Sequence, residues 1–174
     1  MRENVKKEAW KIFNVASFLF ITIFFILPYL VQVSTYFHEK SHVKVLTKYG
    51  VDCEYHVDWL SAIPNFFNPR VEKLGVTRFD LNEYKALDKF QRTEINIAGI
   101  LSDLKFLFLI GIYLAFGNVY LFYKLKSDKK FNPNLALAIN WILFMWLLAL
   151  IQITIANISY NSGDIFMLVR FLRV

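Results

Sequence analysis

Three long stretches without a charged side chain limit the folds open to this sequence. They cover residues 12–37, 106–123 and 131–163, which makes 26, 18 and 33 residues. A run of about 18 or more mostly apolar residues is long enough to cross a membrane as a helix. The composition agrees, since 56% of the 174 residues are hydrophobic and only 20% are charged. We therefore expect an α-helical polytopic membrane protein, and not a disordered chain, a fibre, a disulfide-stapled secreted module or a soluble enzyme.

Charged residues lie in the segments that flank these stretches. The chain has 20 basic and 14 acidic residues, which gives a formal net charge of +6. Basic side chains beside apolar runs are typical of contact with anionic lipid headgroups, and no basic stripe with interleaved aromatic residues indicates nucleic-acid binding. Cys53 is the only cysteine, which excludes an intrachain disulfide. We therefore expect the lipid bilayer as a partner, no nucleic acid, and a location in the cell membrane.

The three stretches predict a single membrane-embedded domain that covers residues 1–174. The first and third stretches are too long for one straight crossing, because a helix rises about 1.5 Å per residue and the hydrocarbon core is about 30 Å thick. Pro28 is expected to kink the first helix, since proline lacks the N–H that an interior helical position donates. The third helix is expected to break at the polar residues 157–164, because irregular backbone in a membrane indicates a buried polar site. The predicted helices span residues 10–48, 96–124, 134–157 and 164–173.

The insert between the first and second helices, residues 50–93, predicts a small mixed unit of strand and helix. Short alternations of polar and apolar residues run through it, interrupted by prolines and a glycine. Residues 51–60 fit an edge strand, and residues 79–95 fit a short amphipathic helix that leads into the membrane.

A His-Glu-x-x-His motif, HExxH, lies at the end of the first apolar stretch, at residues 38–42. Residues i and i+4 of a helix share a face, so His38 and His42 can bind one Zn²⁺ together. Glu39 then lies close enough to take a proton from a water molecule at that metal. The alternative is that both histidines are interfacial residues at a helix end.

A catalytic zinc commonly takes a third protein ligand, and three residues are candidates for it. Asp164 is favoured, because it is the only acidic residue in residues 129–174 and falls at the predicted helix break. A lone carboxylate there needs a cation, and a salt bridge to Arg170 is the alternative to a metal. Glu83 is a rival ligand in a stretch that is otherwise typical of a polar surface helix. His56 is the third candidate, with a surface histidine as its alternative.

Three motifs together resemble the site-2 protease family of intramembrane zinc metalloproteases. HExxH at residues 38–42 matches the first motif of the family. Ala98-Gly99 matches an alanine-glycine-proline-like turn that opens the next helix. Asn157, followed by Asp164, matches an asparagine and a ligand aspartate on a third helix. The order and separation of all three agree with the family over about residues 30–170.

The chain also departs from the family pattern. Ile165 follows Asp164 where the family usually has glycine, and Asp103 stands where it has asparagine. Ser159 or Tyr160 takes the place of a proline after the asparagine. The chain therefore resembles a divergent, minimal member.

The resemblance implies an intramembrane zinc endopeptidase of the regulated intramembrane proteolysis type. Its substrate would be a transmembrane protein or peptide, cut within or next to the transmembrane segment, and its cofactor would be one Zn²⁺ per chain. The implied site residues are Glu39 as general base and then acid, His38, His42 and Asp164 as zinc ligands, and Asn157 and Asn161 at the oxyanion or the substrate backbone.

Three other functions fit parts of the sequence. A non-catalytic zinc-binding membrane scaffold or immunity-type subunit is favoured by the small size and by the missing glycine after Asp164. A membrane zinc protease with Glu83 as its third ligand fits the rival motif. A small ion or metal carrier would use the histidines and Asp164, but it gives Glu39 no specific task.

Overall fold

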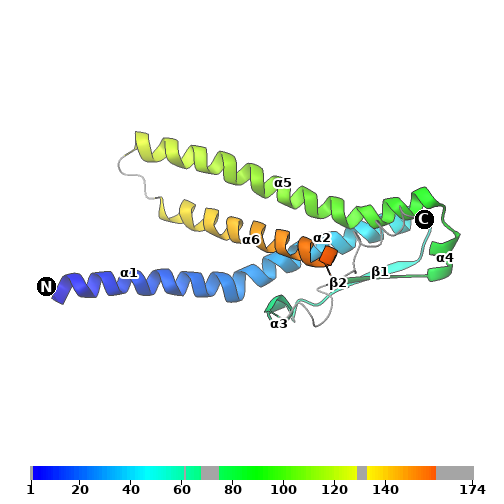
Figure 1. Ribbon diagram of the computed structural model, residues 1–174, viewed down its shortest axis with the longest axis horizontal. Helices are drawn as coiled ribbons and strands as arrows, with labels where there is room; N and C mark the ends of the chain where they lie inside the picture. Colours follow the sequence, from blue (N-terminus) through cyan, green and yellow to red (C-terminus); the bar gives the residue numbers. More distant parts are fainter. Residues whose placement is uncertain (1, 61, 68–74, 129–132, 160–174) are drawn as a thin grey trace.

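The computed structural model describes residues 2–60, 62–67, 75–128 and 133–159, and for residues 2–6, 65 and 153–159 it describes the backbone alone. Three of its helices are long and apolar enough to cross a membrane. They are residues Lys7–Lys48, Lys89–Ser127 and Asn134–Gln152. The expected helical architecture with three membrane-length helices is therefore confirmed (Figure 1).

The first long helix is continuous but changes its winding in the middle. It comprises α1 (Arg2–Ile21), a π-helical turn (Thr22–Ile26) and α2 (Leu27–Lys48). Pro28 lies in the first turn of α2, directly after the π-helical turn. A proline has no N–H to donate, and a wider turn ahead of it accommodates the ring. Figure 1 shows the helix changing direction there, as expected of a kink at this proline.

The helix ends at Lys48, the predicted residue. The amide of Tyr49 donates to the carbonyl of Leu46 at 3.0 Å, and Gly50 follows with φ +76°. This left-handed conformation is favourable for glycine and reverses the chain toward the insert.

The insert contains a two-stranded hairpin and two short helices. Strands β1 (Cys53–Val57) and β2 (Gly75–Phe79) are antiparallel, with Tyr55 opposite Thr77. Helix α3 (Ala62–Phe67) lies between them in sequence, and α4 (Leu81–Ala86) follows β2. The strand predicted over residues 51–60 is present but shorter, and the second strand was not predicted.

The prediction of a single amphipathic helix over residues 79–95 is wrong, because two helices occupy this range. The chain leaves α4 after Ala86, and α5 (Lys89–Ser127) begins three residues later. Asp88 separates them, because its carboxylate accepts from the Gln91 amide at 2.8 Å while Gln91 Oε1 accepts from the Asp88 amide at 3.0 Å. This reciprocal capping starts a new helix at Lys89 rather than at residue 96.

Helix α6 (Asn134–Ser159) begins at the predicted residue and continues two residues past the predicted end. It is tied to α2 by Trp146 Nε1, which donates to Ser34 Oγ at 3.1 Å, and to α5 by Asn140, which donates to Asn118 Oδ1 at 2.9 Å. The first residues of the predicted break at 157–164 are helical, because α6 continues to Ser159. The rest of the predicted break and the helix predicted over residues 164–173 lie outside the described residues.

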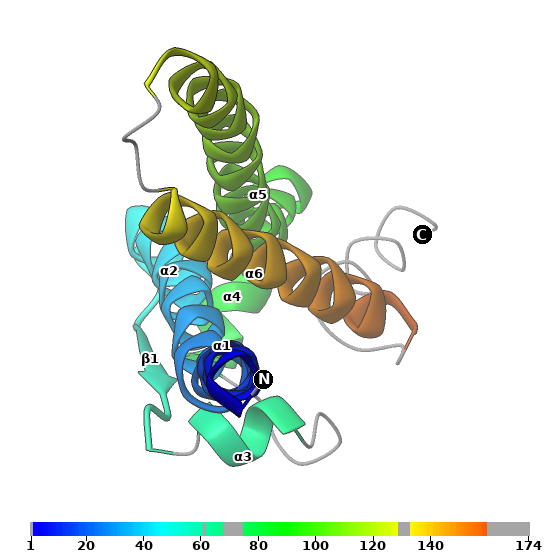
Figure 2. The ribbon, with the colours of Figure 1, turned by 90° about the vertical axis from the view of Figure 1, so that its left-hand side faces the viewer.

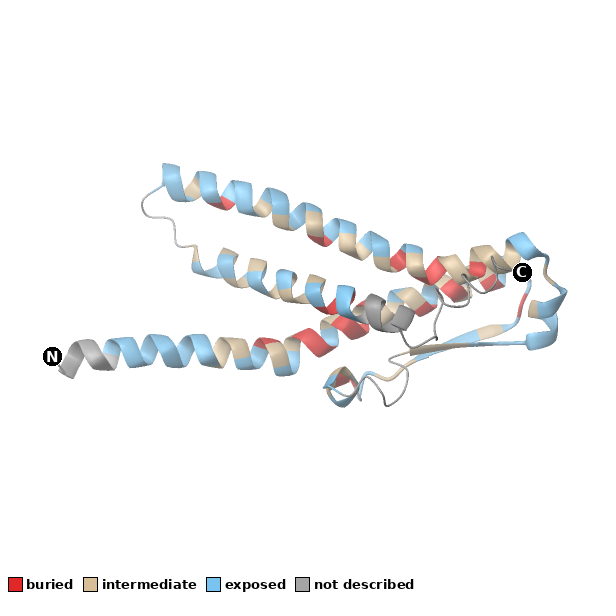
Figure 3. Cartoon of the chain, viewed as in Figure 1, coloured by how far each residue is buried: buried red, intermediate tan, exposed pale blue. Residues whose placement is uncertain are grey.

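Buried side chains lie mainly where α2 meets α5 and α6 (Figure 3). One cluster contains Leu27, Val31 and Ala149, and a second contains Leu46, Val51 and Ile95. Large apolar side chains elsewhere on the long helices are exposed, as expected of helices that face lipid.

The hairpin and α3 lie along α2 on a side away from α5 (Figure 2). The backbone carbonyl of Asp58, just after β1, accepts from Gln32 Nε2 at 2.9 Å. Further on, the ring of Phe67 in α3 lies 5.1 Å from the ring of Phe24, centroid to centroid. The insert therefore follows the apolar stretch of the first helix instead of extending past its end.

Candidate functional site

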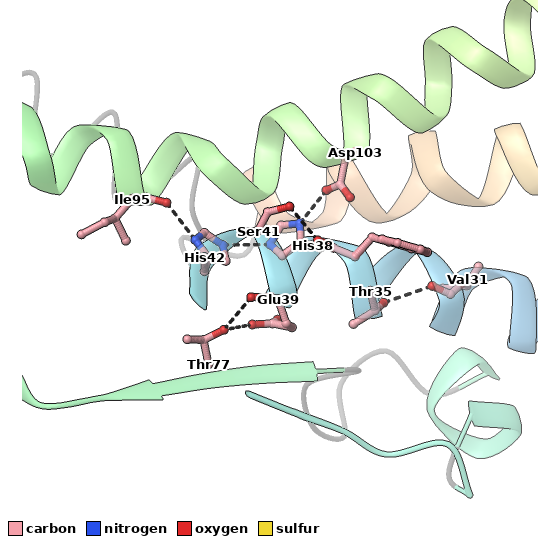
Figure 4. Close-up of polar contacts among 10 residues, drawn as sticks. Val31, Thr35, His38, Glu39, Ser41, His42, Thr77, Ile95 and Asp103 are labelled. Atoms are coloured by element: carbon pink, nitrogen blue, oxygen red, sulfur yellow. Dashed lines mark hydrogen bonds and ion pairs between the residues drawn. The ribbon is translucent and has the colours of Figure 1, made fainter. Parts of the chain in front are cut away.

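The two motif histidines lie one turn apart on α2 and face α5 (Figure 4). Their Nε2 atoms are 3.2 Å apart. The opposite ring nitrogens each have a partner on α5. His38 Nδ1 lies 2.8 Å from Asp103 Oδ2, and His42 Nδ1 lies 2.8 Å from the carbonyl oxygen of Ile95.

These partners determine which nitrogen of each imidazole donates a hydrogen bond and which can bind a metal. A carbonyl oxygen only accepts, so Nδ1 of His42 is the donor to Ile95, and Nε2 is the nitrogen that can serve as a metal ligand. The Asp103 carboxylate likewise accepts from Nδ1 of His38. Metal-binding histidines usually have such an outer partner, which fixes the ring and makes the ligand nitrogen more basic.

The separation of the two Nε2 atoms fits a shared zinc ion. Zinc binds imidazole nitrogen at about 2.0–2.1 Å in tetrahedral geometry, which places two such ligands about 3.3–3.4 Å apart. The 3.2 Å between Nε2 of His38 and Nε2 of His42 is close to that value. The donor set therefore suits Zn²⁺, because the Nε2 atoms of two histidines lie at the spacing that a shared ion needs.

Gly99 on α5 lets the two helices approach at this point. A Cβ atom added to Gly99 would lie 2.5 Å from Nε2 of His38, and closer still to Nε2 of His42. Real Cβ atoms do not approach other atoms this closely, so any larger residue would displace the histidines. The small residue leaves the space in which the two Nε2 atoms converge.

Glu39 points away from α5, toward strand β2 (Figure 4). Successive residues of a helix are about 100° apart around its axis, so Glu39 leaves α2 on a neighbouring side from His38. Its side chain is buried, and Thr77 Oγ1 donates to Glu39 Oε2 at 2.6 Å. Gly75, two residues earlier on β2, lies against the Glu39 side chain.

The described residues do not test the predicted third zinc ligand. Asp164 and Asn161 lie outside them, and Asn157 lies on the part of α6 described as backbone alone. Within the described ranges, no three His, Cys, Asp or Glu side chains are grouped as a metal would need. Asp164 as a ligand therefore stays a prediction.

The two rival ligands have other surroundings. Glu83 Oε2 accepts from the backbone amide of Asp52 at 2.7 Å, a contact that joins α4 to the start of the hairpin. His56 lies on β1 opposite Val76, and its side chain is exposed. The structure thus brings His38, His42, Asp103 and Glu39 into one region, with Glu83 and His56 in structural or surface positions.

Sequence reasoning missed the contacts of two residues in this region, Asp103 and Thr77. Asp103 was identified as a departure from the family pattern, and its pairing with His38 was not predicted. A signal was present, because Ile95, Gly99 and Asp103 follow each other at i, i+4 and i+8 and so share one helix face. Thr77 had no such signal, since its partner is 38 residues away in sequence.

Comparisons with protein-family models, with curated proteins and with solved structures find no match for this chain.

Proposed function

We propose that this chain is a zinc endopeptidase that hydrolyses a peptide bond within or next to the transmembrane segment of a membrane protein or peptide. The convergence of two histidine Nε2 atoms 3.2 Å apart, with both Nδ1 atoms held by α5, carries the proposal. A buried carboxylate at the next position, Glu39, supplies the acid–base group that hydrolysis needs.

Each residue of the site has a separate task. His38 and His42 hold the metal, with Asp164 as the proposed third ligand. Bound zinc would polarise the scissile carbonyl and lower the pKa of water. Glu39 takes a proton from the attacking water and delivers it to the leaving amine. The amide of Asn157 or Asn161 is proposed to donate hydrogen bonds to the oxyanion or to the substrate backbone.

The position of the site supports a membrane substrate. The first charge-free stretch ends at residue 37, directly before His38, and the second begins at residue 106, three residues after Asp103. The paired residues therefore lie at the ends of two apolar stretches, where a membrane helix passes from the hydrocarbon core to the headgroup region. A bond cut there would lie at or near the end of a transmembrane segment.

Exchange of Glu39 for glutamine tests the proposal. We expect Glu39→Gln to bind one zinc per chain, as the wild type does, and to lose cleavage by a factor of about 100 or more, because the amide cannot accept the proton. Zinc is measured by elemental analysis of purified protein. Cleavage is measured by co-expression with a panel of single-span reporter proteins, each with a different transmembrane segment between two soluble domains.

Two outcomes would contradict the proposal. Wild-type protein that is folded but binds no zinc would remove its basis. Wild-type protein that binds zinc and cleaves none of the reporters would favour the non-catalytic zinc-binding scaffold instead. Lys40→Gln is the matched control, since it changes the adjacent, exposed residue of the same helix and should leave both readouts unchanged.

The third ligand is tested by a pair of alanine variants. We expect Asp164→Ala to weaken zinc binding by about 100-fold, because a catalytic site needs three protein ligands. Glu83→Ala should leave zinc binding unchanged, since its carboxylate is engaged with the amide of Asp52. Zinc affinity is measured by competition with a chromophoric chelator. The reverse result would assign the third ligand to Glu83.

A further inference from the structure

Strand β2 makes two contacts with the side chain of the general base. Thr77 Oγ1 donates to Glu39 Oε2 at 2.6 Å and also lies 3.4 Å from the Glu39 backbone carbonyl. Gly75 lies on the same face of the strand, because residues i and i+2 of a strand share a face. A Cβ atom on Gly75 would come within 2.9 Å of Glu39 Cγ. The strand is therefore fitted closely to this side chain.

Glu39 needs such a partner. Its side chain is only 9% exposed, and a buried carboxylate is costly unless it accepts hydrogen bonds. In the part of the chain that the structure describes, Thr77 is the only side chain that donates to this carboxylate. The hydroxyl thus fixes one carboxylate oxygen and leaves the other, Oε1, able to accept a proton.

We infer that Thr77 is a positioning residue for Glu39, through which the hairpin orients the carboxylate of the general base. The inference rests on the proposed function and adds a second element to the site, because the base on α2 is then oriented from β2. A displacement of about 1 Å in a reacting group costs up to about 100-fold in rate, so loss of the hydroxyl should act on the chemical step.

A purely structural role for Thr77 would give a different pattern of variants. Thr77→Val keeps the shape and the methyl group but removes the hydroxyl, while Thr77→Ser keeps the hydroxyl and removes the methyl group. If Thr77 only packs, valine should preserve function better than serine. If its hydroxyl positions Glu39, serine should preserve function and valine should not.

The experiment measures kcat and KM for one reporter that the wild type cleaves, together with zinc content. We expect Thr77→Val to lower kcat by about 10- to 100-fold with KM and zinc content unchanged, and Thr77→Ser to remain within about 3-fold of the wild type. Equal kcat in Thr77→Val and the wild type would overturn the inference. A change confined to KM would also overturn it, because it would indicate substrate binding.

Docking of the hairpin is followed separately with a reporter disulfide. Cys53 Sγ on β1 lies 3.6 Å from Thr47 Oγ1 on α2, so Thr47→Cys places a second thiol beside it. Oxidation of this pair should proceed equally well with Thr77 or valine at position 77, as judged by protection from a maleimide label. A reduced yield with valine would show that the hydroxyl only anchors the hairpin, and would overturn the inference.

The failure of the inference is distinguishable from the failure of the proposed function. If Glu39→Gln is inactive while Thr77→Val is fully active, Glu39 remains the base and only the role of Thr77 is lost. If Glu39→Gln is as active as the wild type, the proposed function itself fails, and with it the inference.

Discussion

Gly99→Ala is expected to weaken zinc binding by more than about 100-fold while the helices remain assembled. The added Cβ would lie 2.5 Å from Nε2 of His38, in the space where the two ligand atoms converge. One or both imidazoles must turn away, and the shared metal position is lost because zinc requires its ligands at fixed distances and angles. Zinc affinity is measured by chelator competition, and assembly by thermal unfolding in detergent.

Gly111→Ala provides the matched control on the same helix. A Cβ atom added to Gly111 has no other heavy atom within 4 Å among the described residues. The control shares the helix, the substitution and the gain in helix propensity, and it should bind zinc as the wild type does. Equal zinc affinity in Gly99→Ala and Gly111→Ala would show that no metal is bound between the histidines and α5.

Asp103→Leu is expected to lower zinc affinity by about 10- to 100-fold, the usual loss when the outer partner of a metal-binding histidine is removed. The carboxylate accepts from His38 Nδ1 at 2.8 Å and so fixes the orientation of the ring. Asp103→Asn keeps an acceptor without the charge and should fall between leucine and the wild type. The measurement is again chelator competition on purified protein.

Asp128→Leu is the control for the lost charge. Asp128 lies just past the other end of α5, so this variant makes the same change in charge far from His38. Its zinc affinity should match that of the wild type. If Asp103→Leu also matches the wild type, Asp103 has no part in the metal centre.

The helices were predictable because their signal is local. A membrane helix is encoded by a continuous apolar stretch, and the predicted end at Lys48 and the predicted start at Asn134 agree with the structure. The start of α5 was missed by several residues, because a capping box at Asp88 outweighs the polar character of the residues that follow. Strand β2 was missed because its pairing with β1 joins segments far apart in sequence.

The candidate site also contains residues that could be predicted from sequence and residues that could not. His38 and His42 could be paired from sequence, because the i, i+4 spacing alone brings them together on a helix. Their outer partners could not, since Asp103 is 65 residues from His38 and Ile95 is 53 residues from His42. The packing of α5 against α2 determines these contacts, and no local pattern encodes it.

The antiparallel order of α2 and α5 links the proposed metal centre to the assembly of the helix pair. Along α2 from His38 to His42, the partners on α5 run backward from Asp103 to Ile95, and a salt bridge from Lys48 to Glu94 closes the series at 2.8 Å. A slide of one helix along the other would break every one of these contacts at once. The two histidines share one face of α2 through its own geometry, but their rings acquire a fixed orientation only when α5 docks in this register.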